Sequence, residues 1–214
     1  MASSQKLILL DMDSTFIQQE VIDLLANHAG VGREVSAITE RSMRGEIDFK
    51  ESLTQRVVLL AGLPERIFDD VREEISLSIG AQEMVAGLHS AGHLVAIVSG
   101  GFENVIAPLL VQEKIDYFKA NHLEVLDGKL TGKTIGPIID RQAKADYLQE
   151  LAEKLDIPLI QTVAIGDGAN DLGMMEIAGL SIAFNAKPVV REFAKARIDD
   201  GNLARVLELI ASDY

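Results

Sequence analysis

The sequence contains no cysteine, so disulfide bonds and thiolate chemistry are excluded. No apolar run approaches the roughly 20 residues of a membrane span, and the first residues lack the basic flank and long apolar region of a secretory signal. Positive charge is also scarce, since 20 lysines and arginines stand against 33 aspartates and glutamates. We therefore expect a cytoplasmic protein that binds neither nucleic acid nor membranes.

What the sequence does contain is enough apolar material for a sizeable core: 48% of the 214 residues are hydrophobic. Short apolar runs that end at carboxylates or small polar residues predict buried strands at 7–11, 94–99, 162–167 and, more weakly, 180–184. Helical patterns lie between these strands. The alternation predicts an α/β fold with a doubly wound parallel sheet, whose active site lies beyond the carboxyl ends of its strands.

One region, residues 16–79, breaks this alternation. It shows no clear strand but four helical segments, one of which starts with Asp48 and Glu51 in a capping-box-like arrangement. We predict a helical cap domain at 16–79, inserted into a core domain of residues 1–15 and 80–214. Because the strand before the insert ends in acidic residues, the cap is expected to cover the site.

Two carboxylates, Asp11 and Asp13, follow the first predicted strand in the stretch DMDST. They would repel each other unless a cation or a shared proton holds them. A local role, as an Asx-turn or a helix cap, is the ordinary reason for such a pair. The pair by itself favours that local role, and the case for chemistry depends on three further stretches.

The stretch VSGGF at 98–102 places Ser99 and Gly100 between a strand and a helix, where backbone N–H groups and the helix dipole favour an anion. In AIGDGANDLGM at 164–174, Asp167 and Asp171 suit a hard cation such as Mg²⁺. They would repel the pyrophosphate of a dinucleotide, and a P-loop is excluded because no Gly-Lys-Ser/Thr sequence occurs. Lys144, by itself, is typical of a solvated helix surface.

Taken in order, these four stretches resemble the haloacid dehalogenase (HAD) superfamily of phosphohydrolases. More narrowly, DMDSTFIQQEVID, VSGGF and GDGANDLGMM are similar to the branch that hydrolyses phosphoserine, and the similarity extends over essentially the whole chain. The resemblance implies a hydrolase of phosphomonoesters in serine biosynthesis. It also implies dependence on Mg²⁺ and an aspartyl-phosphate intermediate.

The resemblance assigns the chemistry to the acidic residues. Asp11 would be the nucleophile, and Asp13 would act first as general acid and then as general base. Mg²⁺ would bind the Asp11 carboxylate, the Asp13 backbone carbonyl and Asp167. Asp171 would orient Lys144 or a metal-bound water. The residues implied to contact the phosphoryl group or the substrate are Ser99, Gly100, Lys144 and Asn170.

The insert is expected to select the substrate. By position, Glu20 matches the acidic residue that binds the ammonium group of phosphoserine, and Arg56 matches the arginine that binds its carboxylate. Met43 and Phe49 would form an apolar wall, although simple core packing is an equally good interpretation of these two. The four histidines show no metal-binding spacing.

Two alternatives stay open at this point. A phospho-acceptor domain of the response-regulator type also combines aspartates, Mg²⁺ and a lysine, but its phosphorylated aspartate follows a later strand. A phosphatase or phosphotransferase of the same superfamily could instead act on another small phosphomonoester, such as phosphohomoserine or phosphothreonine. The sequence also leaves open whether the protein is a monomer or a homodimer.

Overall fold

The computed structural model describes residues 5–212. Residues 1–4, which belong to the stretch that lacks the features of a secretory signal, lie outside the described part, as do residues 213 and 214. None of the helices between residues 5 and 212 combines the length and the apolar character needed to cross a membrane.

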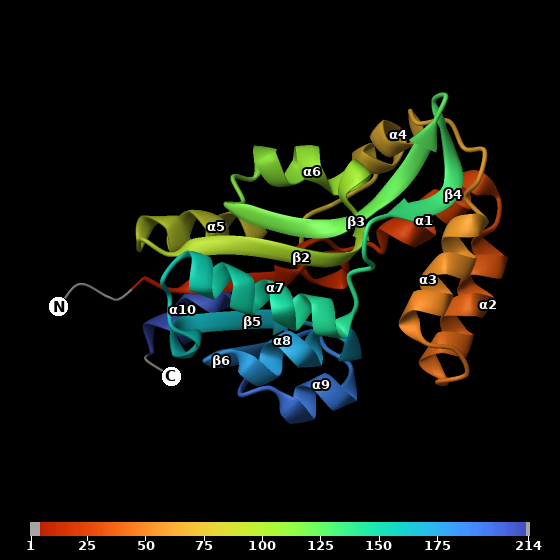
Figure 1. Cartoon of the computed structure of the whole chain (residues 1–214). Coiled ribbons are helices and arrows are strands. Elements are labelled where there is room, and N and C mark those ends of the chain that lie inside the picture. Colours follow the sequence, from red (N-terminus) through yellow and green to blue (C-terminus); the bar gives the residue numbers. More distant parts are fainter. Residues whose placement is uncertain (1–4, 213–214) are drawn as a thin grey trace.

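The described residues form a seven-stranded sheet at the centre of the molecule (Figure 1). Its order is β4-β3-β2-β1-β5-β6-β7, and all neighbouring strands are parallel except β3 and β4. The strands are β1 (Leu7–Asp11), β2 (Leu94–Phe102), β3 (Tyr117–Leu126), β4 (Lys129–Ile135), β5 (Thr162–Gly166), β6 (Leu180–Phe184) and β7 (Ala196–Ile198). The predicted α/β fold with a mostly parallel sheet is confirmed.

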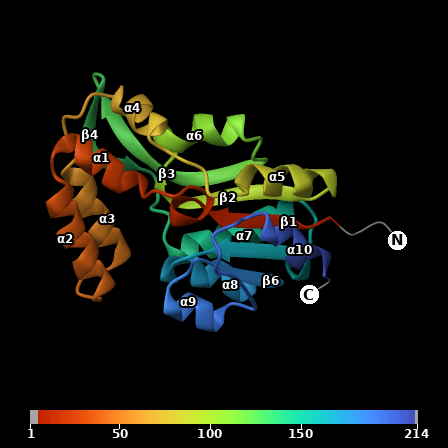
Figure 2. The same cartoon turned by 180° about the vertical axis from the view of Figure 1, so that it is seen from behind.

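Helices cover both faces of the sheet (Figures 1 and 2). One face packs against α5 (Ala81–Ser90), α6 (Glu103–Gln112) and α10 (Arg205–Ala211), and the other against α7 (Arg141–Lys154), α8 (Leu172–Ile177) and α9 (Pro188–Phe193).

The position of β1 at the centre of the sheet explains why its sequence is apolar from Leu7 to Leu10. Ile8 and Leu10 point into one of two hydrophobic clusters, and Leu7 and Leu9 point into the other. Successive side chains of a strand alternate between the two faces, so a strand between two helical layers needs apolar residues at every position.

The order of the strands brings the predicted site residues to one edge of the sheet. β1 lies between β2 and β5, and Leu10 is in register with Ile97 and Ile165. Asp11 therefore ends β1 beside Ser99 of β2 and close to Asp167, which follows β5. This is the carboxyl edge, where an open α/β sheet binds its ligands.

The insert between β1 and β2 begins with four α-helices: α1 (Val21–Ala29), α2 (Gly32–Met43), α3 (Phe49–Val58) and α4 (Ile67–Glu73). Figure 1 shows α2 and α3 beyond the carboxyl edge of the sheet. The two connecting segments run side by side, since Ile17 pairs with Leu77 and the Ser78 N–H donates to the Phe16 carbonyl (2.9 Å). The division into a core and a cap at 16–79 stays a prediction.

Three strands were missed by the sequence analysis: β3, β4 and β7. The hairpin of β3 and β4 reaches the insert, because the Gly62 N–H donates to the Leu130 carbonyl (2.8 Å) and the Leu130 N–H to the Leu63 carbonyl (2.9 Å). The hairpin, which the prediction assigns to the core, is thus hydrogen-bonded to the helical segment that covers the site.

Candidate active site

Asp11 and Lys144 form the base of the site. The Asp11 Oδ1 atom accepts from the Met12 N–H (2.7 Å) and lies 2.7 Å from Lys144 Nζ. Lys144 Nζ also donates to Asp171 Oδ1 (2.7 Å). The lysine is 0% exposed. Although the sequence around it is typical of a helix surface, Lys144 is a buried cation between two carboxylates.

These contacts change the proton affinities of Asp11 and Lys144. Burial lowers the pKa of Lys144, but the attraction of Asp11 and Asp171 outweighs it, so the net pKa is raised and the ammonium form is favoured. Burial, followed by repulsion from Asp171, raises the pKa of Asp11 well above its ordinary value, and Lys144 opposes this rise. Asp11 is therefore a desolvated carboxyl group whose ionised form depends on the neighbouring ammonium group of Lys144.

Asp13 lies in a short, irregular helical turn after β1 (Met12–Phe16), in which Ser14 adopts a left-handed conformation (φ 54°). Asp13 Oδ1 accepts from the Val21 N–H (2.9 Å), and Oδ2 accepts from the Ser99 hydroxyl (3.1 Å). Burial, followed by repulsion from Glu20, raises the pKa of Asp13 to about 7. Both its protonated and ionised forms are therefore accessible near neutral pH, as a general acid and base requires.

The turn at the end of β2 is fixed by hydrogen bonds on both sides of one peptide group. The Gly101 N–H donates to Ser99 Oγ (2.8 Å), and Asn121 Nδ2 donates to the Gly100 carbonyl (2.8 Å). A side chain at Gly101 would come within 2.6 Å of Asp13 Oδ2. Glycine is required at this position because Asp13 approaches the backbone so closely.

The turn after β5 carries Asp167, Asn170 and Asp171. Asp171 is fully buried, and its Oδ2 accepts from the N–H groups of Asp167 and Gly168 (3.1 Å each). Asn170 Nδ2 lies 3.5 Å from Asp11 Oδ2. Burial, followed by repulsion from Asp171, raises the pKa of Asp167 to about 7.

Three carboxylates of the described residues are placed to hold a metal ion. Oxygen atoms of Asp11, Asp167 and Asp171 lie within 4.8 Å of one another. Asp171 is already engaged by Lys144 and by two backbone N–H groups, so Asp11 and Asp167 are the better available ligands. Carboxylate oxygens suit a hard divalent cation, which would favour the ionised forms that burial disfavours. The residues present fit such a cation.

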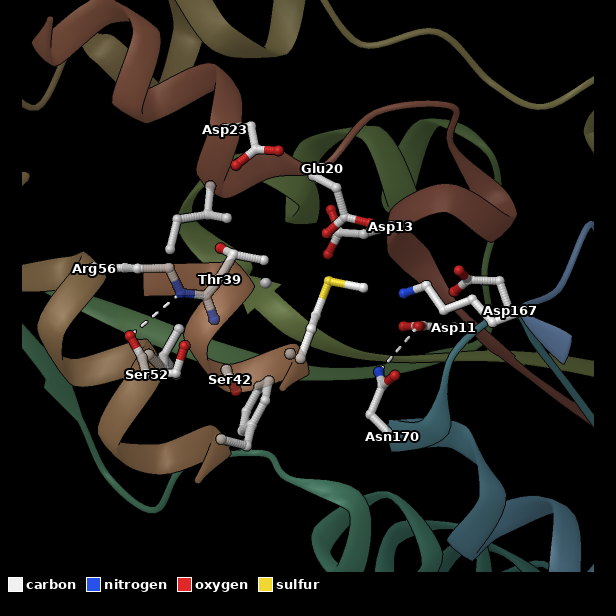
Figure 3. Close-up of a pocket in the computed structure, with 17 residues that line it drawn as sticks. Asp11, Asp13, Glu20, Asp23, Thr39, Ser42, Ser52, Arg56, Asp167 and Asn170 are labelled. Atoms are coloured by element: carbon white, nitrogen blue, oxygen red, sulfur yellow. Dashed lines mark hydrogen bonds between the residues drawn. The ribbon is translucent and has the colours of Figure 1, made fainter. Parts of the chain in front are cut away.

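A cavity of about 360 Å³ lies between these carboxylates and the helical insert. Figure 3 shows Asp11, Asp167 and Asn170 on one side of it and Arg56 and Ser52 on the other. The cap-side residues expected from the sequence all line the cavity: Glu20, Met43, Phe49 and Arg56. Ser99, Lys144 and Asp171 do not line it but lie beneath, bonded to Asp13, Asp11 and Asp167 respectively, which do.

Residues in and beside the pocket were also missed by the sequence analysis. The Ser14 hydroxyl donates to Glu20 Oε1 (2.7 Å) and so orients that carboxylate. Asp23, Ser52 and Lys187 line the cavity. Two of them left a signal in the sequence, since Asp23 lies three residues after Glu20 and Ser52 lies four residues before Arg56, spacings that bring side chains together on a helix.

The electrostatic balance of the pocket is acidic. Among the described residues that line it, five carboxyl groups, those of Asp11, Asp13, Glu20, Asp23 and Asp167, stand against two basic side chains. An anionic ligand would be repelled at the carboxyl edge of the sheet without further positive charge. An anionic ligand in this pocket therefore needs positive charge near Asp11 and Asp167, from Lys144 or from a bound cation.

The comparisons with known proteins agree with this geometry. Residues 8–176 match the family of haloacid dehalogenase-like hydrolases. The chain belongs to this family. This HAD hydrolase is 50% identical over 210 residues to the phosphoserine phosphatase of Streptococcus thermophilus, and the alignment covers 98% of either chain. The receiver-domain alternative is therefore excluded, and the predicted resemblance is confirmed.

Two solved structures are similar to this HAD hydrolase, each with a TM-score of 0.91 over 97% of this chain and 99% of the other. One is a substrate-bound phosphoserine phosphatase complex (41% identity), and the other is a phospho-aspartyl intermediate analogue of phosphoserine phosphatase (42% identity).

Proposed function

We propose that this HAD hydrolase is a Mg²⁺-dependent phosphoserine phosphatase, which converts O-phosphoserine and water into serine and phosphate. The observation that carries the proposal is the cavity itself, where Asp11 and Asp13 lie opposite Glu20 and Arg56. The identity with named phosphoserine phosphatases supports the same substrate. A role in serine biosynthesis and a cytoplasmic location are part of this proposal.

The first step is attack by an Asp11 carboxylate oxygen on phosphorus. The bond between phosphorus and the serine oxygen breaks, and that oxygen takes a proton from Asp13. The pKa of about 7 supports this role of Asp13 as the acid. The products of the step are serine and a phosphate group bonded to Asp11, so one difficult displacement is divided into two easier ones.

The second step releases phosphate from Asp11. A water molecule attacks phosphorus and gives its proton to Asp13, while the bond between phosphorus and the Asp11 oxygen breaks. Asp13 returns to its protonated form and Asp11 to its carboxylate. The hydrogen bonds of Asp13 to Val21 and Ser99 hold it in place through both steps (2.9 and 3.1 Å).

Positive charge and donors near Asp11 stabilise the transferring phosphoryl group. Lys144 is 2.7 Å from Asp11, Asn170 lies in the same pocket, and Gly100 offers its backbone N–H from a turn that Asn121 fixes. Mg²⁺, when bound, would supply positive charge that lets one anion approach another. The residues that would hold it are Asp11, Asp167 and the backbone carbonyl of Asp13.

The cap side of the pocket is suited to an amino acid. Glu20 offers a carboxylate to an ammonium group, and Arg56 offers a guanidinium to a carboxylate. Phe49 and Met43 line the space between the two ends of the pocket and supply apolar surface. Phosphate release from a panel of small phosphomonoesters would test the proposal, and phosphoserine is expected to be the preferred substrate.

Replacing Arg56 with alanine should lower kcat/KM for phosphoserine. The expected loss of transition-state stabilisation is about 2–4 kcal/mol, the scale of losing one partner of a buried charged hydrogen bond. The guanidinium would act on a part of the substrate remote from phosphorus, where its binding energy positions the reacting group. Hydrolysis of an aryl phosphate, which lacks both amino-acid groups, should hardly change. Steady-state kinetics with both substrates measure this contrast.

The matched control is Arg66→Ala, which removes an exposed arginine of the same insert that does not line the cavity. It should leave both activities unchanged. If Arg56→Ala lowers both activities equally and also lowers the melting temperature, Arg56 is structural. The pocket would then be better suited to another phosphomonoester, such as phosphohomoserine or phosphothreonine.

Removal of metal should abolish activity, and added Mg²⁺ should restore it, because the charge of Lys144 does not by itself balance the carboxyl groups of Asp11 and Asp167 that the phosphate must approach. Excess Ca²⁺ should inhibit, since its larger and looser coordination spoils the in-line geometry. The melting temperature should rise with Mg²⁺, because a ligand of the folded state alone stabilises it. Full activity in the presence of a chelator would contradict the proposed dependence on metal.

A further inference from the structure

The cap side of the cavity contains a hydroxyl group without a partner. Ser52, on α3, is 1% exposed and lines the cavity. Among the described residues, two buried side-chain oxygens lack a hydrogen-bond partner, Thr15 Oγ1 and Ser52 Oγ, and of these only Ser52 belongs to the cavity wall. A buried polar group without a partner is costly, so its position in a binding pocket points to a bound ligand.

Ser52 and Arg56 lie next to each other, one helical turn apart on the same face of α3. The Arg56 Nε–H donates to the Ser52 backbone carbonyl (3.3 Å), which places the guanidinium beside the serine (Figure 3). This hydrogen bond uses Nε and leaves the two terminal nitrogens for a ligand. The two terminal nitrogens of Arg56 and the hydroxyl of Ser52 therefore belong to neighbouring residues on the same wall of the cavity.

We propose that the Ser52 hydroxyl donates a hydrogen bond to the carboxylate of the substrate, beside the two terminal nitrogens of Arg56. The inference rests on the proposed function and deepens it, because it makes Ser52 a residue that selects phosphorylated amino acids over phosphomonoesters without a carboxylate. Phe49 and Leu53 also line the cavity, and apolar surroundings strengthen a hydrogen bond to a charged group.

The test compares Ser52→Ala with the wild type on O-phosphoserine and on O-phosphoethanolamine, which keeps the phosphate and the amine but lacks the carboxylate. For phosphoserine, kcat/KM should fall about 10- to 100-fold, the scale of one hydrogen bond to a charged group. For phosphoethanolamine, kcat/KM should change by less than about twofold, because this substrate has no carboxylate to accept the hydrogen bond. The melting temperature should stay constant or rise, because the unpaired hydroxyl has been removed.

A second measurement does not depend on turnover of phosphoethanolamine. Free serine should inhibit the hydrolysis of an aryl phosphate, and Ser52→Ala should raise its inhibition constant by a similar factor. Thr54→Ala is the matched control, since Thr54 is an exposed hydroxyl residue of the same helix whose Oγ1 donates to the Lys50 carbonyl (2.8 Å). This control should leave all of these values unchanged.

The possible failures can be told apart. Equal losses on phosphoserine and phosphoethanolamine, or a lower melting temperature, would mean that Ser52 only packs the helix. Ser52→Ala could instead leave kcat/KM for phosphoserine and the inhibition constant of serine unchanged while Arg56→Ala is still impaired. That result would overturn this inference and leave the proposed function standing. A wild-type protein that hydrolyses an aryl phosphate but not phosphoserine would overturn the proposed function and this inference together.

Discussion

An Asp11→Asn variant should fold normally and yet release phosphate from phosphoserine at least about 10⁴-fold more slowly than the wild type, the scale of losing a catalytic nucleophile. The amide keeps the shape of the side chain, and its oxygen can still accept from the Met12 N–H and from Lys144, as Asp11 Oδ1 does at 2.7 Å. It cannot form the phosphorylated intermediate. Single-turnover phosphate release measures the effect.

The fold should tolerate this change because of the charges around Asp11. Burial and Asp171 raise the pKa of Asp11, so the ionised carboxylate opposes folding once the pH exceeds its ordinary value. A neutral amide removes that cost at neutral pH, while Lys144 keeps Asp171 as its partner (2.7 Å). The melting temperature should therefore stay within a few degrees of the wild type or rise.

A matched control for this variant is Asp127→Asn, at the exposed tip of the hairpin between β3 and β4. Its left-handed conformation (φ 50°) also suits asparagine. This control should keep full activity. If folded Asp11→Asn released phosphate within about tenfold of the wild-type rate, far less than the loss of a nucleophile costs, another group would have to attack phosphorus.

The part of the fold that could be predicted from the sequence is the part buried on both faces. β1 and β6 are buried at every residue, so they appear as short, largely apolar runs. β3 and β4 alternate with exposed polar residues and leave the sheet to contact the insert, and β7 has three residues. Their sequences, KANHLEVL for example, carry no pattern that distinguishes them from a loop or a helix.

The candidate site also has one part that could be predicted from the sequence and one part that could not. Asp11, Ser99 and Asp167 follow apolar runs directly, so their position at one edge of the sheet follows from the strands alone. The burial of Lys144 does not, because it depends on how α7 packs against the sheet. The position of Ser52 in the cavity depends on how α3 lies over the site, a tertiary contact that no local pattern encodes.

Lys144→Met should both unfold more easily and lose activity, because it removes the cation from between two carboxylates. Asp11 and Asp171 each lie 2.7 Å from Lys144 Nζ and are buried, so they would face each other unpaired. Breaking a buried ion pair by removing one partner costs about 3–5 kcal/mol of folding free energy. Denaturant unfolding at neutral pH measures the loss, and Lys154→Met, at the exposed end of the same helix, is the control.

The loss of stability in Lys144→Met should depend on pH in a defined direction. The pKa of Asp11 is already raised in the wild type, although the ammonium group of Lys144 opposes this rise. Removing that group would therefore raise the pKa further. A group with a raised pKa in the folded state costs stability only as the pH rises above its ordinary value, and the cost grows until the pH passes the folded value. The difference between Lys144→Met and the wild type should therefore shrink as the pH falls toward 4.

A second substitution separates the effect on folding from the effect on catalysis. Adding Asp171→Asn to Lys144→Met removes one of the two unpaired charges, while the amide oxygen can still accept from the N–H groups of Asp167 and Gly168. The double variant should regain part of the lost stability, since the two residues are in direct contact and their effects are not additive. It should not regain activity, because the phosphoryl group still lacks the positive charge of Lys144. Recovery of turnover together with stability would show that Lys144 serves only the fold.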